Sequence, residues 1–329
     1  MILVIVPCLI LLGLYLRNHT TQTQPLVKPN LLLIGDSIGY GVRDCTDVSC
    51  DLEANTFLAL YASYHGLPRY INASESETSA FEPDNLIKES TSTSAKKMSG
   101  VARARAGEFA KYHDADVIIE YGRNDVNAGV ASDSNFYNAL LEIGNSLLSP
   151  GGDNVARNNS LVYMTIPPMT PTSWISAASK RTARPEYKEQ IASTEYPIEY
   201  DSIFSARIWE AAQELGADIV PVHEYLYFHP DEKYFSTDGI HPSSEGVKLL
   251  TWLFTFRGGV IKTDLNSIPL NSTISVTSNE HGFGMVVSKK DGQIIQAKPL
   301  ELIEGNRYPI LRINDEMTLL STVPISAIQ

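Results

Sequence analysis

The sequence has few of the residues that mark a metal centre, a disulfide-stabilised fold or a nucleic-acid-binding surface. It contains three cysteines among 329 residues, and their spacing matches no zinc-binding pattern. Cys45 and Cys50 lie close enough in sequence for a local disulfide in an exported protein, with a reduced structural pair as the alternative. No long run of Lys or Arg is present and the formal net charge is -12, so the chain repels phosphate backbones. We therefore expect no metal site and no nucleic-acid partner.

Long apolar runs are also scarce, and the one nearly unbroken run covers residues 2–16. It is shorter than the roughly 20 residues that a membrane-spanning helix needs, but it has the length of a signal-peptide core. No Lys or Arg precedes it and no small-x-small cleavage site comes after it, so the segment could stay attached as an anchor. We expect a signal peptide or signal anchor over residues 1–24 and an exported protein, either secreted, periplasmic or attached to a membrane through residues 2–16. A buried first strand is the alternative.

Short apolar runs then alternate with segments of helical spacing. The runs cover 31–35, 115–122, 160–168 and 217–222, and the helical segments cover 101–113, 136–148 and 203–216. This alternation predicts an α/β domain over residues 25–260, with a doubly wound parallel sheet and helices on both faces. After about residue 260 the pattern changes to short strands with a turn at Lys290-Asp291-Gly292, which predicts a small β-rich C-terminal region over 261–329.

Polar residues gather where the predicted strands end. Ser37 comes after the first strand and Asn124 after the strand at 115–122, so both are expected at the carboxyl edge of the sheet, where such folds bind ligands. Asp238 and His241 lie three residues apart, just before a predicted helix. A serine hydroxyl becomes a good nucleophile when a histidine takes its proton, and a carboxylate fixes the tautomer of that histidine. Ser37, His241 and Asp238 supply these three parts.

Two other families use a similar glycine-rich start. In an α/β-hydrolase the nucleophile comes after several strands, and the acid and histidine lie on separate later loops, whereas here the serine ends the first strand and Asp238 precedes His241 by three. A dinucleotide-binding dehydrogenase of the short-chain type would need a Tyr-x-x-x-Lys pair, which the sequence does not contain. Both interpretations are disfavoured.

The sequence resembles the SGNH (GDSL-type) hydrolase family over about residues 29–257. The resemblance rests on three blocks in order, Gly-Asp-Ser-Ile at 35–38, Gly-x-Asn-Asp at 122–125 and Asp-x-x-His-Pro at 238–242. It implies a flavodoxin-like three-layer α/β/α sandwich with a central parallel sheet and no metal or organic cofactor. It further implies Ser37 as nucleophile, His241 as base and Asp238 as the partner of His241.

The resemblance also implies an oxyanion hole, made by the backbone N–H of Ser37, the Asn124 side chain and one further backbone N–H. The family presents a glycine for this last donor on the loop after the second strand, which we place at 89–100. Ser94 has the expected separation from Asn124, and Gly100 is the substitute. Asp36 is expected to hydrogen-bond the turn that holds Ser37. Arg123 is expected either to contact substrate or to pair with an acid such as Asp125. Five further histidines, at 65, 113, 223, 229 and 281, have no partner spacing and are expected on the surface or in packing.

The substrate is less well defined, because fold and triad determine the reaction class and not the ester. The acidic, exported chain has no apolar stretch outside the leader that would form a lipid-binding lid, which favours an O-acetyl esterase acting on glycans. A lipase or lysophospholipase, an acyltransferase on the same scaffold and a non-catalytic glycan-binding protein are the alternatives. A complete set of Ser37, Asn124, Asp238 and His241 disfavours the pure binding protein, because binding alone does not require all four.

Overall fold

The structure is a computed structural model. It describes residues 29–41, 56–76, 78–81, 98–128, 132–149, 157–170, 198–255, 273–275, 282–291, 293–302, 307–314 and 317–320. The leader, Cys45, Cys50 and Ser94 lie outside the described residues. Within the described part of the chain, no helix combines the length and the apolar character that crossing a membrane requires.

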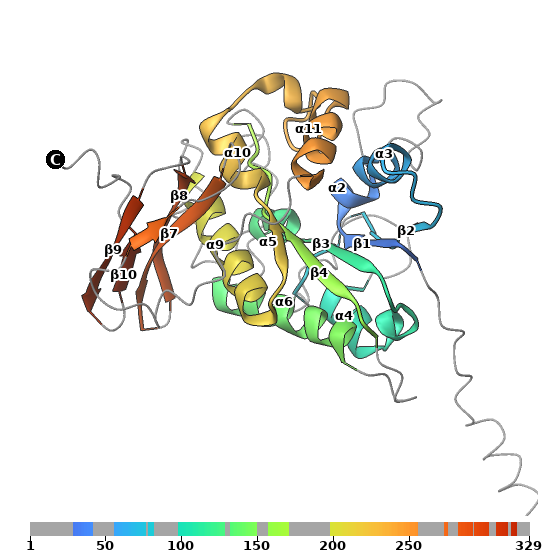
Figure 1. Cartoon of the computed structure of the whole chain (residues 1–329), viewed down its shortest axis with the longest axis horizontal. Coiled ribbons are helices and arrows are strands. Elements are labelled where there is room, and N and C mark those ends of the chain that lie inside the picture. Colours follow the sequence, from blue (N-terminus) through green and yellow to red (C-terminus); the bar gives the residue numbers. More distant parts are fainter. Residues whose placement is uncertain are drawn as a thin grey trace, which may run out of the picture.

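Five parallel strands form the central sheet, in the spatial order β2-β1-β3-β4-β5 (Figure 1). Their bounds are β1 (Leu31–Gly35), β2 (Tyr70–Asn72), β3 (Asp116–Glu120), β4 (Ser160–Met164) and β5 (Asp218–Val220). The order reverses direction at β1, so β1 and β3 lie side by side at the point where an open α/β sheet binds its ligands. Gly35 is in register with Glu120 at the carboxyl ends of these two strands.

Helices cover both faces of this sheet. Their bounds are α2 (Ser37–Tyr40), α3 (Phe57–Tyr64), α4 (Gly100–Arg105), α5 (Arg123–Ala128), α6 (Asp133–Leu148), α9 (Ile198–Leu215), α10 (Val222–Phe228) and α11 (Ser244–Thr255). Along β1, Leu32 and Ile34 belong to the core cluster that includes residues of α4, α6 and α9, while Leu31 and Leu33 belong to the cluster that includes residues of α3, α10 and α11. This alternation arises from the two-residue period of a strand, and it buries both faces of the sheet. The predicted three-layer α/β/α sandwich is confirmed.

Two local predictions differ from the structure. The short edge strand β2 was not predicted, because three half-buried residues give no clear apolar run. The single helix predicted over 101–113 is two pieces, α4 and a 3-10 helix at Glu108–Lys111, separated by Gly107 at φ 71°. A left-handed residue ends an α-helix, and glycine adopts that conformation at little cost.

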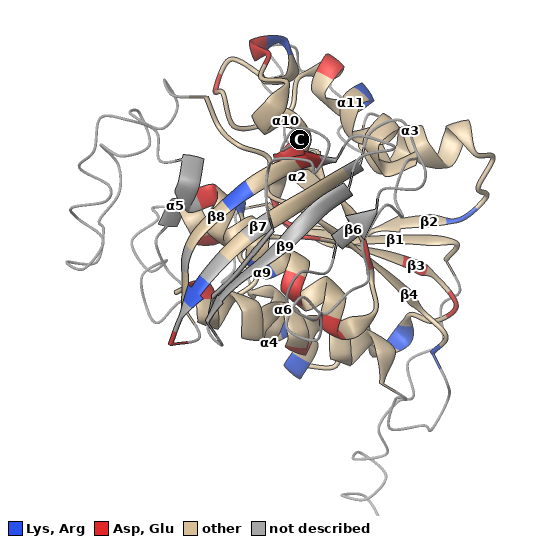
Figure 2. Cartoon of the chain, turned by 60° about the vertical axis from the view of Figure 1, so that its left-hand side comes forward, with Lys and Arg blue, Asp and Glu red and all other residues tan. Residues whose placement is uncertain are grey.

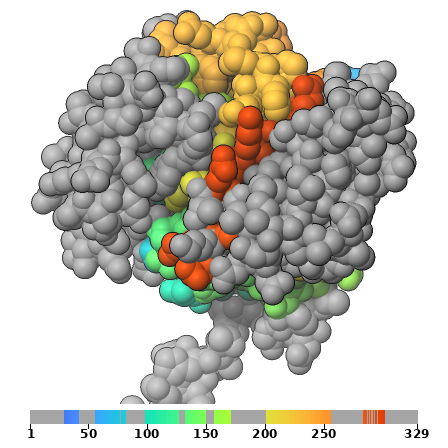
Figure 3. Space-filling model, turned by 90° about the vertical axis from the view of Figure 1, so that its left-hand side faces the viewer, coloured from blue at the N-terminus to red at the C-terminus, as the bar shows by residue number. Residues whose placement is uncertain are grey.

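The C-terminal region contains the predicted hairpin, formed by β7 (Gly282–Lys290) and β8 (Gln293–Leu302), with Lys290 paired to Gln293 across the turn. Three further short strands, β6 (Thr273–Ser275), β9 (Arg307–Asn314) and β10 (Met317–Leu320), pair with one another. The hairpin packs against α9 and α10 of the sandwich, as Figures 2 and 3 show from two directions. Met285, Ile294 and Ala297 of the hairpin bury Ala206 of α9, so apolar contacts join the hairpin to the sandwich.

Candidate active site

The turn after β1 presents Ser37. The chain leaves the strand at Gly35, and Asp36 caps the four-residue helix α2, with its Oδ1 accepting the Ile38 N–H at 3.0 Å. This is the expected role of Asp36 in the turn, and it is confirmed. A capping carboxylate fixes the start of a helix by accepting an N–H group that lacks an intrahelical partner. Ser37 is therefore the first residue of a well-fixed turn, and it is 8% exposed.

The loop before α11 brings Asp238 and His241 to the same place. His241 Nε2 lies 2.9 Å from Ser37 Oγ, and His241 Nδ1 lies 2.5 Å from Asp238 Oδ2. The three side chains thus form one hydrogen-bonded series across 204 residues of sequence. An imidazole between a hydroxyl and a carboxylate can accept the hydroxyl proton through one ring nitrogen while the other nitrogen donates to the carboxylate.

Asp238 is held in its ionised form. Its Oδ1 accepts the Ser236 hydroxyl at 2.7 Å and the backbone N–H groups of Ile240 and His241 at 2.8 and 2.9 Å. Partial burial raises the pKa of Asp238, but the hydrogen bonds from His241, Ile240 and Ser236 outweigh it and hold the pKa far below its usual value. The carboxylate therefore stays negative beside His241 throughout the physiological pH range.

Asn124 lies beside the Ser37 turn, in the first turn of α5. Its backbone N–H lowers the pKa of the nearby Asp36 carboxyl group, and its side-chain Nδ2 donates to the Thr78 carbonyl at 2.7 Å. An amide group carries two N–H donors, so this bond fixes the side chain and leaves a second hydrogen for another acceptor. The structure thus brings Asn124 next to the turn that carries Ser37.

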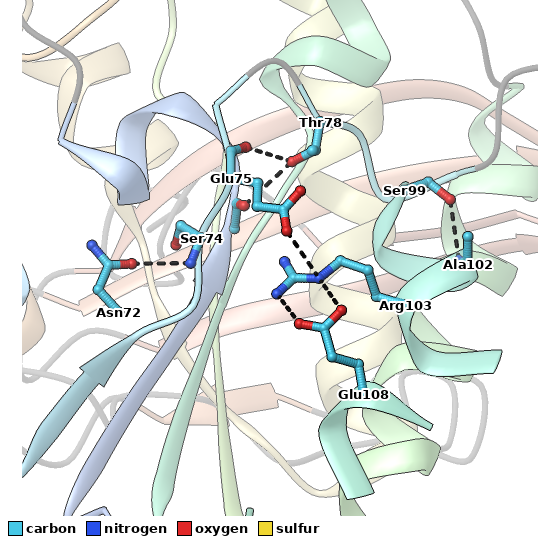
Figure 4. A network of polar contacts seen from close by, with 9 residues as sticks. Asn72, Ser74, Glu75, Thr78, Ser99, Ala102, Arg103 and Glu108 are labelled. Atoms are coloured by element: carbon cyan, nitrogen blue, oxygen red, sulfur yellow. Dashed lines mark hydrogen bonds and ion pairs between the residues drawn. The ribbon is translucent and has the colours of Figure 1, made fainter. Parts of the chain in front are cut away.

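The loop after β2 crosses the carboxyl ends of β1 and β3. Glu75 N–H donates to the Gly35 carbonyl at 3.0 Å, and Asp125 accepts the N–H groups of Ala80 and Phe81 at 3.0 Å each. The same loop also contacts α4, because Glu75 lies near Arg103, which pairs with Glu108 as well (Figure 4). In the described residues, the segment beside the Ser37 turn is therefore 73–81 without residue 77.

The family resemblance places the third oxyanion donor on this loop after β2. Ser94 lies outside the described residues, so its assignment stays a prediction. The Gly100 N–H donates to the Ser79 carbonyl at 2.8 Å, and a Cβ at Gly100 would meet Tyr121 and Ile143. Gly100 is therefore the buried first residue of α4 with its N–H already used, and it is not an oxyanion donor in this structure.

Arg123 pairs with an acid, which was one of its two expected roles, but the acid is Asp201 and not Asp125. Its guanidinium forms two hydrogen bonds with Asp201 of α9, at 2.5 and 2.9 Å, and a third with the Pro167 carbonyl at 3.0 Å. Both side chains of the ion pair are 1% exposed. Arg123 thus anchors α5 to α9 and to the segment after β4 instead of facing a substrate. Asp201 lies 78 residues from Arg123, and no spacing in the sequence relates the two.

Buried carboxyl groups lie behind Ser37, and one of them, Glu120, was not singled out in the sequence. Burial raises the pKa of Asp36 to about 6 and that of Asp125 to about 7, against the backbone N–H groups that each accepts. Burial and the neighbouring Asp36 raise the pKa of Glu120 well above its usual value. Glu120 ends β3 directly after the apolar residues 117–119, and a charged residue buried at the end of such a run is the signal that could have identified it.

The other described histidines are in packing or on the surface, as expected. His223 is fully buried and bonds to Ser202 at 2.9 Å, and burial lowers its pKa to about 4. His65 and His229 contact the rings of Tyr61 and Tyr225. His281 lies outside the described residues.

Comparison with known proteins supports the fold. No protein-family model and no curated protein matches the sequence. Similar solved structures include Est24, a carbohydrate acetylesterase from Sinorhizobium meliloti, with 18% identity, a TM-score of 0.48 and coverage of 69% of this chain and 96% of its own. A member of the lipolytic G-D-S-L family from Veillonella parvula has 10% identity, a TM-score of 0.44 and the same coverage of both chains. A further structure, 16% identical, reaches a TM-score of 0.52 over 70% of this chain and 96% of its own, and this last likeness establishes a shared three-layer fold.

Proposed function

We propose that this protein is a serine-dependent carboxylic ester hydrolase of the SGNH (GDSL-type) family. The observation that carries the proposal is the hydrogen-bonded series from Ser37 Oγ through the His241 ring to Asp238. The three sequence blocks at 35–38, 122–125 and 238–242 support the same family, since they hold these residues in the order that the family uses.

In the proposed reaction, His241 Nε2 takes the hydroxyl proton of Ser37 as Oγ attacks the acyl carbon of the ester. The N–H of Ser37 and the Asn124 side chain donate to the developing oxyanion. The intermediate then collapses, the alcohol leaves with the proton from His241, and the acyl group stays on Ser37. Water, deprotonated by His241, attacks the acyl-enzyme, releases the acid and restores the Ser37 hydroxyl.

The proposed substrates are O-acetyl esters of glycans. This choice rests on the acidic composition, on the predicted export signal and on the lack of an apolar stretch that would form a lipid-binding lid. A panel of O-acetylated glycans and long-chain p-nitrophenyl esters tests it. A clear preference for the long chains would replace the glycan assignment with a lipase.

The test of the reaction class is hydrolysis of p-nitrophenyl acetate by the protein and by its Ser37→Ala variant, with circular dichroism spectra to establish equal folding. We expect activity in the protein and a loss of several orders of magnitude in the variant, because the nucleophile is removed. Activity that survives the substitution would exclude Ser37 as the nucleophile. An inactive but folded protein would favour the glycan-binding alternative.

A further inference from the structure

Glu120 lies directly behind the turn that carries Ser37. It is the last residue of β3, is in register with Gly35 and is 2% exposed. Its Oε2 accepts the Gly39 N–H at 2.9 Å and the Asp36 N–H at 3.2 Å. One buried carboxyl oxygen therefore holds the backbone on both sides of Ser37.

The two glycines that flank the serine make room for this carboxyl group. A Cβ at Gly35 would lie 2.3 Å from the Glu120 backbone oxygen and 2.5 Å from Glu120 Oε2. A Cβ at Gly39 would lie 2.7 Å from Ser74 Oγ and 2.9 Å from Glu120 Oε2. Such approaches are far closer than ordinary carbon–oxygen contacts, so any larger residue would push Glu120 away from the turn. The spacing of glycines in Gly-Asp-Ser-Ile-Gly thus fits the position of Glu120 as well as the chemistry of Ser37.

The Glu120 carboxyl group faces the Asp36 carboxyl group, and burial together with the Asp36 charge raises the pKa of Glu120. Two ionised carboxylates have no hydrogen to share, so a hydrogen bond between the two groups requires a proton on one of them. Asp36 Oδ1 already accepts the Ile38 N–H, whereas the buried Asp36 Oδ2 accepts no N–H or O–H group among the described residues. A proton on Glu120 that points at Asp36 Oδ2 satisfies both side chains.

We propose that Glu120 is a positioning residue that retains a proton at neutral pH, donates it to Asp36 and thereby fixes the turn that carries Ser37. The inference rests on the proposed function, since it assigns Glu120 a part in presenting the nucleophile. The pair then carries a single negative charge, located on Asp36, instead of two adjacent buried charges that would repel each other.

The surroundings agree with this distribution of charge. His241 and Arg123 face Asp36 and favour its ionised form, while burial and Asp36 itself favour the protonated form of Glu120. Asp125 and Tyr121 also face the pair; burial raises the pKa of both side chains, and so does the Asp36 charge. The negative charge of Asp36 is therefore placed where it can also stabilise His241 when that ring gains the Ser37 proton.

The test compares Glu120→Gln with Glu120→Ala in the full chain. The glutamine amide reproduces a protonated Glu120, because its oxygen accepts the Gly39 and Asp36 N–H groups while its NH₂ donates to Asp36. We expect Glu120→Gln to keep kcat for p-nitrophenyl acetate within about 3-fold of the unmodified protein. We expect Glu120→Ala to lower kcat on the order of 10²-fold with little change in KM, since small displacements of a reacting group cost about this much.

Two measurements report on the Glu120–Asp36 pair without an activity assay. The first is the infrared carbonyl band of a protonated carboxyl group at mildly alkaline pH, where ordinary Asp and Glu side chains are fully ionised. We expect this band in the protein and its loss in Glu120→Gln. The second is hydrogen exchange at the Gly39 N–H, which should stay slow in Glu120→Gln and become fast in Glu120→Ala.

These outcomes separate the two proposals. An infrared band that is absent from the protein, or unchanged in Glu120→Gln, would overturn the retained proton. Equal damage in the glutamine and alanine variants would overturn the hydrogen-bonding role of Glu120. If the unmodified protein is inactive, the proposed function fails, while the infrared band and the exchange at Gly39 still decide the inference about Glu120.

Discussion

Two aspartates flank the Ser37–His241 pair, and their surroundings shift their pKa values in opposite directions. Asp36 is completely buried, and burial raises its pKa to about 6. Asp238 has a side chain that is 40% exposed, and the hydrogen bonds to His241, Ile240 and Ser236 hold its pKa far below the usual value against the effect of partial burial. The same residue type therefore has a different charge preference on the two sides of the site.

The difference arises from how many donors each carboxylate meets and how much water it keeps. Asp238 accepts hydrogen bonds from the Ser236 hydroxyl, from two backbone N–H groups and from the ring of His241, and solvent reaches the loop that carries it. Asp36 has lost all contact with solvent and faces a second buried carboxyl group, Glu120. Asp238 can therefore stay negatively charged beside His241, while burial limits the negative charge on Asp36 and Glu120 behind Ser37.

The largest expected effect is on activity in Asp238→Asn. An asparagine at this position cannot hold His241 in the tautomer that accepts the Ser37 proton, so kcat/KM should fall on the order of 10³–10⁴-fold. Steady-state kinetics with p-nitrophenyl acetate measure it. Asp231→Asn is the matched control, because Asp231 caps the 3-10 helix at Glu232–Tyr234 and pairs with Lys233 in the segment that leads to the same loop. Equal losses in both variants would mean that the loop as a whole, and not the His241 contact, is being disturbed.

The next effect concerns stability and pH. The folded pKa of Asp36, about 6, lies above the ordinary value of 3.8, so its contribution to stability is complete below the ordinary value and is lost as the pH rises through 6. This difference corresponds to about 3 kcal/mol in the free energy of unfolding. Asp238 has the opposite sign: its contribution is present above its ordinary pKa and is lost as the pH falls through its lower folded pKa.

Urea unfolding at a series of pH values measures both aspartates. Relative to the unmodified protein, Asp36→Asn should lose less stability as the pH rises from acid to neutral. Asp238→Asn should lose less as the pH falls into the acid range. Parallel pH profiles for the two variants would contradict the comparison between the two carboxyl groups.

A smaller effect is expected for Asp125→Asn, a buried acid that differs from Asp36 in having both oxygens engaged. Its two oxygens accept the N–H groups of Phe81 and Ala80, so an asparagine must turn its NH₂ toward one of these donors. One buried donor then lacks an acceptor, which should lower the free energy of unfolding by about 1–3 kcal/mol.

Thermal unfolding measures this loss. Asp291→Asn is the control for removing a charge, because Asp291 is exposed at the hairpin turn with φ 51°, a conformation that asparagine also adopts readily. No loss in Asp125→Asn would mean that these hydrogen bonds do not hold the loop after β2.

The sequence predicted the parts of the site that depend on strand ends. Ser37 comes just after a strand of five apolar or small residues, and the carboxyl edge of a parallel sheet collects the residues that come after each strand. The 204-residue separation between Ser37 and His241 was therefore no obstacle to placing them together. Patterns of neighbouring residues also sufficed to predict four strands of the central sheet and the hairpin turn at Lys290-Asp291-Gly292.

The sequence could not predict features that depend on packing between distant elements. β2 has three half-buried residues, and without its parallel pairing to β1 it looks like a loop. The partner of Arg123 lies on α9, and only the docking of that helix brings Asp201 to the guanidinium. Glu120 forms its pair with Asp36 across two strands, which no spacing along the chain reveals.

The smallest effect is expected for Ser236→Ala, which tests how far the hydrogen bonds of Asp238 are responsible for its low pKa. The Ser236 hydroxyl donates to Asp238 Oδ1 at 2.7 Å, and its loss leaves the bonds from Ile240 and His241 in place. Removal of one such bond should cost about 1 kcal/mol, or roughly 5-fold in kcat/KM at neutral pH. The pKa of Asp238 should rise, so an NMR titration of the Asp238 carboxyl group should have its midpoint at a higher pH than in the unmodified protein. Thr237→Ala, at the exposed neighbouring position, is the control. An unchanged midpoint in Ser236→Ala would mean that the His241 ring and the backbone N–H groups alone keep Asp238 ionised.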